Sequence, residues 1–153
     1  MPRPGGYYDR IGFALPGASV SITPFGPAAP VVLTPGANVS IASVTIPINE
    51  DGIYLFGVLG SLAIVFGASA PSSLQTFPSV DGTAGVQQTT ISPALLVGLA
   101  TVSLPIAAMI ISARLVAGSH TVALFGRTTG GGSSATVQVN TAGLWVVSWN
   151  LQD

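Results

Sequence analysis

Few residues in this sequence have side chains that could do chemistry. His120 is the only histidine, and there is no cysteine. The acidic residues are Asp9, Glu50, Asp51, Asp81 and Asp153. A single histidine cannot build a His-based metal site within one chain. We interpret His120 as a structural residue at the start of a strand, because the sequence shows no evident acid–base partner for it.

The spacing of the acids favours turns over catalysis. Glu50 and Asp51 are adjacent, so a strand would point them to opposite faces, whereas a glycosidase needs two carboxylates facing across a cleft. Asp81-Gly82 is typical of a turn, and the glycines at 130–132 are followed by no Lys that would indicate a phosphate loop. The sequence therefore predicts a protein that is not an enzyme, with no catalytic residue, no cofactor and no metal. A weak calcium site at Asp51 or Asp81 is the open alternative.

Charge is scarce along the whole chain. Of 153 residues, 48% are hydrophobic and only 6% are charged, against about a quarter charged in typical domains. The positive side chains are four arginines, and the net charge is −1, which excludes the basic stripe that nucleic acid requires. A surface so poor in charge must consist of Ser, Thr, Gly, Asn and Gln, or much of it must be buried against partners, as in an obligate oligomer.

Long uncharged stretches raise the alternative of a membrane or pore protein. Leu95 to Val116 would pass a hydropathy window, but Thr, Ser, Gly and Pro interrupt every apolar run, and no Lys/Arg-rich flank sets an orientation. We expect no membrane span. The first ten residues lack the apolar stretch of a signal peptide.

Residues 1–30 differ from the rest in being rich in Pro and Gly, which disfavour a regular central strand. They also carry aromatic and aliphatic side chains that would be costly to leave in water. We predict an extended N-terminal arm over 1–30 that binds a partner surface, with a segment that wraps its own domain as an equal alternative. The predicted partner-binding residues of the arm are Arg3, Tyr7, Tyr8, Arg10, Ile11, Phe13, Leu15 and Phe25.

Residues 31–153 are predicted to form one β domain. Alternation with one slip at Ala42–Ser43 predicts a bulged strand over 39–48, and Ile53 to Val65 indicates a strand buried on both faces. We expect a long loop over 66–85, a short strand over 86–91, and two strands within 95–116 broken near Pro105. The stretch 120–127 predicts a strand, with a hairpin tip at 128–134 and a partner strand over 135–139.

The last strand places Trp145, Val147, Trp149 and Leu151 on one face. Core packing is the default interpretation for most of the aromatic residues in the strands, which are Tyr54, Phe56, Phe66, Phe125, Trp145 and Trp149. Many short strands separated by Gly and Pro turns favour an all-β sandwich or barrel.

Two segments resemble a known family. The run TIPINEDGIYLFGVLGSLAI (45–64) resembles a segment of trimeric jelly rolls of the tumour-necrosis-factor and complement-C1q type. The run SARLVAGSHTVALFGRTTGGGSSATVQV (112–139) resembles their late hairpins, which occur in many phage virion proteins. With the Pro-rich arm and the lack of Lys and Cys, the chain is similar to capsid decoration (auxiliary or cement) proteins of thermophilic tailed bacteriophages.

That resemblance implies a jelly-roll β-sandwich with an extended arm. It implies a homotrimer on the outer surface of the capsid that stabilises the expanded head. The expected partners are further copies of itself, the major capsid protein and neighbouring decoration trimers, with no nucleic acid and no membrane. The alternative is a receptor- or glycan-binding tip of a phage tail fibre, which uses the same fold.

Overall fold

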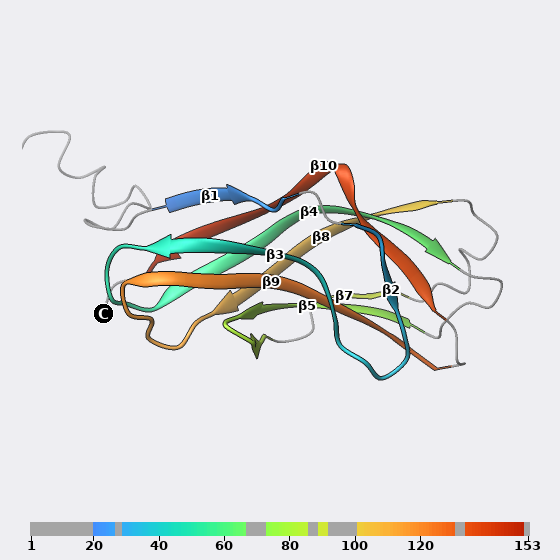
Figure 1. Cartoon of the computed structure of the whole chain (residues 1–153), viewed down its shortest axis with the longest axis horizontal. Helices are drawn as coiled ribbons and strands as arrows, with labels where there is room; N and C mark the ends of the chain where they lie inside the picture. Colours follow the sequence, from blue (N-terminus) through green and yellow to red (C-terminus); the bar gives the residue numbers. More distant parts are fainter. Residues whose placement is uncertain are drawn as a thin grey trace, which may run out of the picture.

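A computed structural model describes residues 20–26, 29–66, 73–85, 89–91, 101–130 and 134–151. These residues form two antiparallel sheets stacked as a sandwich (Figure 1). No helix in the described part of the chain is long and apolar enough to cross a membrane. The strands are β1 (Val20–Pro24), β2 (Val31–Leu33), β3 (Val39–Ile48), β4 (Tyr54–Phe66), β5 (Ser73–Val80), β6 (Thr83–Ala84), β7 (Thr89–Ile91), β8 (Val102–Ile111), β9 (Gly118–Thr129) and β10 (Ala135–Asn150).

The strand pairing is nested, and it defines a jelly roll. Sheet A has the order β1-β10-β4-β8, with β2 also on β10, and sheet B has the order β3-β9-β5-β6, with β7 also on β5. The first strands therefore pair with the last, β3 pairs with β9, β4 with β8 and β5 with β7. A long antiparallel ribbon folded over itself in this way is the jelly-roll sandwich. The expected fold class is confirmed.

The core lies between the two sheets because alternate side chains of each strand point inward. In β8 the alternation runs without interruption, with every second residue buried. Most inward side chains are aliphatic or aromatic, with Thr76 and Thr128 among the exceptions, and none of the buried side chains is charged. Its most buried members are Leu33, Ile46, Phe56, Val58, Leu62, Ile64, Leu74, Val122, Leu124, Val137, Leu144 and Val146.

Two predicted strands agree with the structure. β3 carries a register shift between Ser40 and Ala42, which is the bulge expected from the slip in alternation. β4 spans nearly the predicted range, but it is buried on one face only. Leu59 and Val65 on its other face are 37% and 43% exposed, so the expectation of burial on both faces was wrong.

The predicted loop over 66–85 contains a strand. β5 pairs with β9 over eight residues, and β5 joins β6 through a two-residue turn at Asp81 and Gly82. Both turn residues have positive φ, 48° and 82°, as a tight hairpin turn requires. The sequence did not predict this strand because the small and hydroxylated side chains of the stretch give no apolar alternation.

Pro105 does not break β8. The strand runs from Val102 to Ile111, with Pro105 opposite Ser61 of β4. Within the described residues β8 pairs with β4 alone, so it is an edge strand. Proline is tolerated at such an edge because its missing N–H can face away from the ladder.

The stretch 135–139 does not form a hairpin with the preceding strand. Ala135 to Val139 belong to β10, which pairs with β2 and β4 in sheet A, whereas β9 lies in sheet B. The connection over 130–134 therefore crosses from one sheet to the other. Local alternation predicted both strands but not the sheet to which each belongs.

The predicted arm boundary at residue 30 does not match the structure. β1 lies inside the predicted arm and pairs with β10 from Trp145 to Trp149. Phe25 is 6% exposed, and its amide donates to the carbonyl of Leu144 at 2.8 Å. Phe25 is therefore part of this chain's own core, contrary to the partner-binding role expected for it. The other predicted arm residues precede residue 20 and lie outside the described residues.

Candidate assembly face

The outer face of sheet A is apolar across four strands. Outward side chains of β1, β10, β4 and β8 stand side by side in register, and none of them is charged. We call this surface the A face. Its members are Ile22, Pro24, Leu55, Gly57, Leu59, Ala107, Met109, Ile111, Trp145, Val147 and Trp149.

Several of these side chains are open to solvent. Ile22 and Ile111 are 64% and 65% exposed, Met109 is 53% and Trp145 is 43% exposed. Two neighbouring rows cross the sheet, one from Ile22 through Val147 and Gly57 to Met109, and the next from Pro24 through Trp145 and Leu59 to Ala107. The apolar side chains are therefore contiguous rather than scattered.

The size of the A face fits an interaction surface. Four strands about 4.8 Å apart and three rows about 6.8 Å apart give roughly 400 Å² in projection, which is within the size at which exposed apolar patches mark interaction sites. Val65 and Val32 continue the same side of the sheet and are 43% and 53% exposed. Beyond Leu59 the ladder of β4 and β8 places Ser61 and Ser103 on the same side, so the continuous apolar surface is the A face itself.

The tryptophans of the last strand belong to this face and not to the core. The shared face of Trp145, Val147 and Trp149 was predicted correctly. Core packing, the default interpretation for most of the aromatic residues, does not hold for Trp145, which is 43% exposed. Trp149 lies over Gly57, where an added Cβ would be 3.4 Å from Cζ3 of the indole. The absence of a side chain at Gly57 lets the ring lie flat on β4.

The outer face of sheet B has the opposite character. Hydroxyl side chains of β3, β5 and β9 dominate it, and they pair across the strands. Arg127 Nε donates to Gln75 Oε1 at 2.7 Å, and the hydroxyls of Ser73 and Thr129 lie 2.6 Å apart. Its aromatic pair, Phe77 and Phe125, is stacked with ring centroids 5.9 Å apart. These pairs join β5 to β9 within one chain, and they give the outer face of sheet B the polar groups that the A face lacks.

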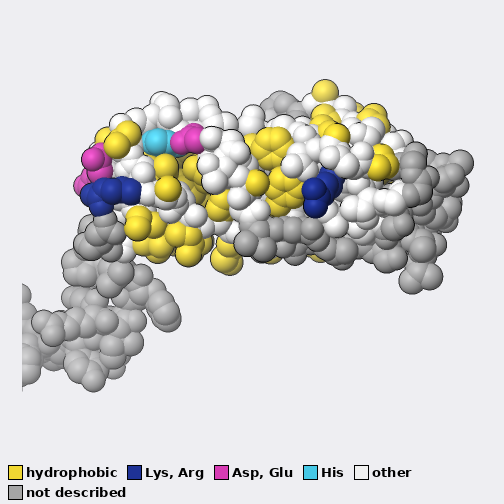
Figure 2. Space-filling view, turned by 90° about the horizontal axis from the view of Figure 1, so that it is seen from below, with side chains coloured by type: hydrophobic (Ala, Val, Ile, Leu, Met, Phe, Trp, Pro, Cys, Tyr) yellow, Lys and Arg dark blue, Asp and Glu magenta, His cyan; other side chains and the backbone are white. Residues whose placement is uncertain are grey.

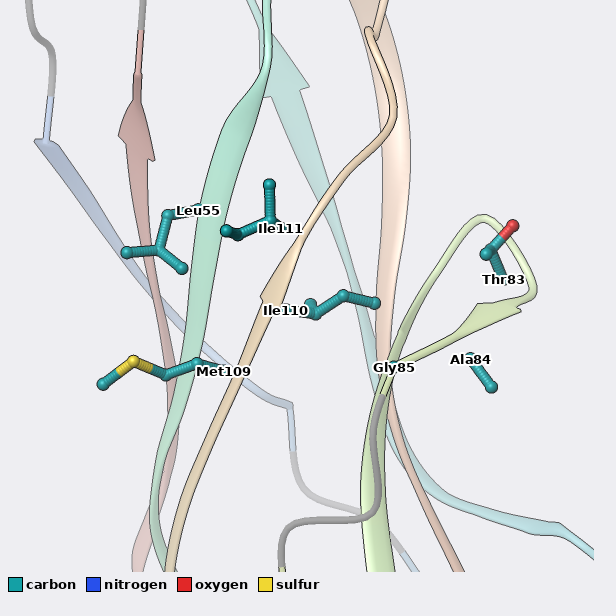
Figure 3. Close-up of a pocket in the computed structure, with 7 residues that line it drawn as sticks. All are labelled: Leu55, Thr83, Ala84, Gly85, Met109, Ile110 and Ile111. Carbon is teal, nitrogen blue, oxygen red and sulfur yellow. The ribbon is translucent and has the colours of Figure 1, made fainter.

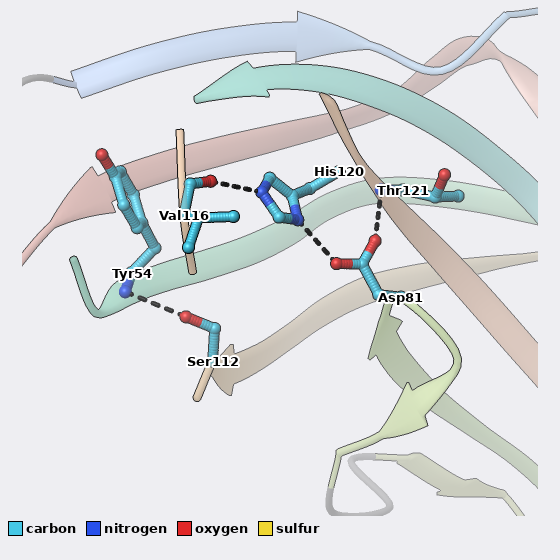
Figure 4. A network of polar contacts seen from close by, with 6 residues as sticks. All are labelled: Tyr54, Asp81, Ser112, Val116, His120 and Thr121. Atoms are coloured by element: carbon cyan, nitrogen blue, oxygen red, sulfur yellow. Dashed lines mark hydrogen bonds and ion pairs between the residues drawn. The ribbon is translucent and has the colours of Figure 1, made fainter. Parts of the chain in front are cut away.

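His120 has two polar partners that the sequence did not reveal. Its Nδ1 lies 2.6 Å from Oδ2 of Asp81, and its Nε2 lies 2.8 Å from the carbonyl oxygen of Val116 (Figure 4). The second oxygen of Asp81 accepts the amide of Thr121 at 2.8 Å. This network ties the turn between β5 and β6 to the start of β9.

The network is built for a charged imidazole. A carboxylate and a carbonyl can only accept, so both ring nitrogens of His120 must donate, which requires the doubly protonated form. The hydrogen bond with Asp81, followed by that with Val116, raises the pKa of His120. Burial raises the pKa of Asp81, but the hydrogen bonds from His120 and Thr121 outweigh this and lower it overall. Because Nε2 donates to a carbonyl, His120 has no free lone pair for general-base work.

Polar groups elsewhere in the described chain serve the fold. Asp51 accepts the amide of Ala117 at 2.7 Å, and the hydroxyl of Tyr54 donates to the carbonyl of Glu50 at 2.8 Å. Burial and the charge of Glu50 raise the pKa of Tyr54. No group of three His, Asp or Glu residues that could hold a metal occurs among the described residues. Figure 2 shows one face of the molecule, on which charged side chains occur only in a few separate places.

No protein-family model matches this sequence, and a comparison with curated proteins gives no match. Solved structures resemble it at low identity. Dimeric latent PorU from Porphyromonas gingivalis is 13% identical with a TM-score of 0.50, over 87% of this chain and 13% of that chain. T=1 particles derived from infectious bursal virus give 15% identity and a TM-score of 0.43, over 88% of this chain and 36% of that chain.

A family 35 carbohydrate-binding module from Clostridium thermocellum is 9% identical with a TM-score of 0.32, over 88% of this chain and 99% of that chain. This chain thus spans 13% of the PorU chain and little more than a third of the viral chain. At these identities the likeness concerns the fold alone.

Proposed function

We propose that this protein is a structural subunit of a virion, a trimeric decoration protein on the outside of a phage capsid that stabilises the expanded head. The observation that carries the self-assembly is the A face, whose uncharged side chains are exposed across four strands. We take a second copy of the chain as the occupant of this face. An uncharged face can pack against a different part of a neighbouring copy, as a threefold contact requires, without burying an unpaired charge. At roughly 400 Å² in projection it has the size at which exposed apolar patches mark interaction sites.

The capsid location is supported by the sequence resemblance of residues 45–64 and 112–139 to trimeric jelly rolls of virion proteins. The physical demands of the role agree with the chain. An interface almost free of charge is insensitive to salt because there is little to screen. The Asp81–His120 network and the hydroxyl pairs of sheet B stabilise the single subunit, which leaves sheet A free for partners. We propose no catalytic activity.

The N-terminal segment supplies the second attachment in this proposal. Residues 1–19 precede β1 and could span about 60 Å if extended. Binding at two places raises the effective concentration of each contact. β1 and Phe25 belong to the sandwich, so the proposed arm comprises only the residues before Val20.

The direct test is binding to expanded, undecorated capsid shells followed by cryo-microscopy. We expect density for a trimer on the outer surface of the shell. A chain lacking residues 2–18 should remain folded and trimeric but bind shells at least tenfold more weakly. Unchanged shell affinity of that chain would remove the arm from the proposal, and density at the tail would overturn the capsid location.

A further inference from the structure

Among the residues that the structure describes, nothing guards half of the outer edge of β8 in sheet A. Natural sheets guard an edge strand with Pro, Lys, a bulge or a covering segment. Pro105 guards the first half of β8, but Ile106–Ile111 contains no proline, no charge and no register shift. Within the described residues this half of β8 has a strand partner on one side only, which is β4.

A groove lies beside this edge. It has a volume of about 650 Å³ and lies between β8 and the segment from β6 to Gly85 (Figure 3). Among its described lining residues, Thr83 alone has a polar side chain. Gly85 closes one side, where an added Cβ would lie 3.1 Å from Cδ1 of Ile110. The lining residues are Leu55, Thr83, Ala84, Gly85, Met109, Ile110 and Ile111.

The groove is continuous with the A face. Leu55, Met109 and Ile111 belong to both, and Figure 3 shows the Ile110 side chain on the side of Gly85. Any copy that covers the A face therefore comes close to the unprotected edge. The groove is apolar and lies along backbone, so its natural occupant is an apolar strand.

The sequence before β1 contains a segment with the alternation that such a strand would have. Ile11, Phe13 and Leu15 alternate with Gly12 and Ala14, so an extended backbone would put the three large side chains on one face. The segment has no charge, as the groove requires. Four residues separate it from Val20, where β1 begins.

Strand direction decides which copy supplies the segment. Val20 is opposite Trp149, and Trp149 is opposite Leu55, which pairs with Ile111. The start of β1 is therefore level with the Ile111 end of β8. If the segment of the same chain reached β8, its last residue, Leu15, would lie at that end. Its backbone would then run in the same direction as β8, so the added strand would be parallel. Every pair of named strands in both sheets is antiparallel, and parallel pairing is slightly weaker. The segment of a neighbouring copy can approach β8 from either end, so it can pair with β8 in the antiparallel direction.

We propose that Ile11–Leu15 of a neighbouring copy adds as an antiparallel strand to Ile106–Ile111 of β8, with its large side chains in the groove. This deepens the proposed function by naming the surface that the arm binds, and it rests on self-assembly of the chain. Residues before Ile11 stay free for the shell. Each subunit is then tied to its neighbour both by a face and by a strand.

The chain has no cysteine, so the contact can be tested by single substitutions. Full-length Phe13→Cys and Met109→Cys chains are mixed, allowed to exchange, and treated with a short bis-maleimide cross-linker. We expect a cross-linked product containing one chain of each kind. A mixture of Phe13→Cys with Thr45→Cys, which places the second thiol on the outer face of sheet B, is the matched control and should give at least tenfold less product.

A groove variant separates the strand contact from the A face. Ala84 lines the groove from β6 and is not part of the A face, so Ala84→Lys should lower the cross-linking yield at least fivefold and leave the sedimentation mass unchanged. A chain that carries both Phe13→Cys and Met109→Cys can also be cross-linked within itself. If the cross-link forms only within such chains and never between two chains, the proposal is overturned. Equal yields with the Thr45 control would also overturn it. If the protein is oligomeric but gives no cross-link, the strand contact is rejected and self-assembly is not. If the protein is monomeric and gives no cross-link, self-assembly is rejected as well.

Discussion

The imidazole of His120 lies with Nδ1 2.6 Å from Oδ2 of Asp81, joining β9 to the turn after β5. The side chain of His120 is 11% exposed and that of Asp81 is 44% exposed, so water partly screens the pair. A contact of this kind contributes about 0.5–1 kcal/mol. Both groups titrate, so the contribution depends on pH.

The His120–Asp81 pair predicts a defined pH window. The raised pKa of His120 means that its contribution is complete below the unfolded value of about 6.5 and is lost as pH rises through the folded value. The lowered pKa of Asp81 means that its contribution is present above about 3.8 and is lost as pH falls through the folded value. Stability from the pair is therefore greatest between about pH 4 and 6.5.

Urea unfolding at pH 5.5 and pH 8.5 measures this effect at fixed protein concentration. The wild-type chain should lose about 0.5–1 kcal/mol of unfolding free energy from this pair on going to the higher pH, and His120→Gln should lose less. Asp81→Asn is a useful second variant because Asn tolerates the positive φ of this turn. An equal pH dependence in all three chains would contradict the assigned ion pair.

Phe25 predicts a large effect for a residue first expected to bind a partner. It is buried, and its amide is bonded to Leu144, so Phe25→Ala should lower the unfolding free energy by about 3–4 kcal/mol. Removal of residues 2–18 should leave the melting temperature within a few degrees of the wild type. If Phe25→Ala were as stable as the shortened chain, the position of Phe25 in the core would be wrong.

Gly60 predicts a backbone effect in the centre of β4. Its φ is +146°, and an added Cβ would clash with the carbonyl oxygen of Gly143, at the irregularity in β10. Gly60→Ala should destabilise the fold by about 3 kcal/mol or more. Gly118→Ala is the matched control, because Gly118 has a φ of +153° with no atom within 4 Å of an added Cβ. Comparable losses in the two variants, measured by denaturant unfolding, would contradict a steric cause at Gly60.

Much of the fold could be predicted from the sequence because alternation is a local signal. The bulged strand β3, most of β4, and the shared face of Trp145, Val147 and Trp149 follow from period-two patterns. β5 could not be predicted in this way, because its outward Ser73 and Ser79 and its inward Thr76 are all small and polar. The strand break expected near Pro105 was wrong for a different reason. Proline is tolerated in an edge strand, and only the tertiary fold shows that β8 lies at an edge.

The candidate site was predicted only in part. The lack of charge indicated burial against partners, but the surface that lacks it could not be found without strand pairing. Ile22, Leu59 and Met109 are far apart in sequence, and only the register of four strands makes them neighbours. The acid–base partner of His120 was missed because Asp81 is 39 residues away.

The central claim is that the A face joins copies of this chain, and sedimentation of Leu59→Glu tests it most directly. Leu59 lies in the row of Trp145 and Ala107, and a charge buried there without a partner is costly. Thr45→Glu is the matched control on the outer face of sheet B. We predict that the wild type and Thr45→Glu sediment at three times the 15.3 kDa of one chain, while Leu59→Glu is folded and monomeric. A monomeric wild type, or a Leu59→Glu chain that remains a trimer, would contradict the account.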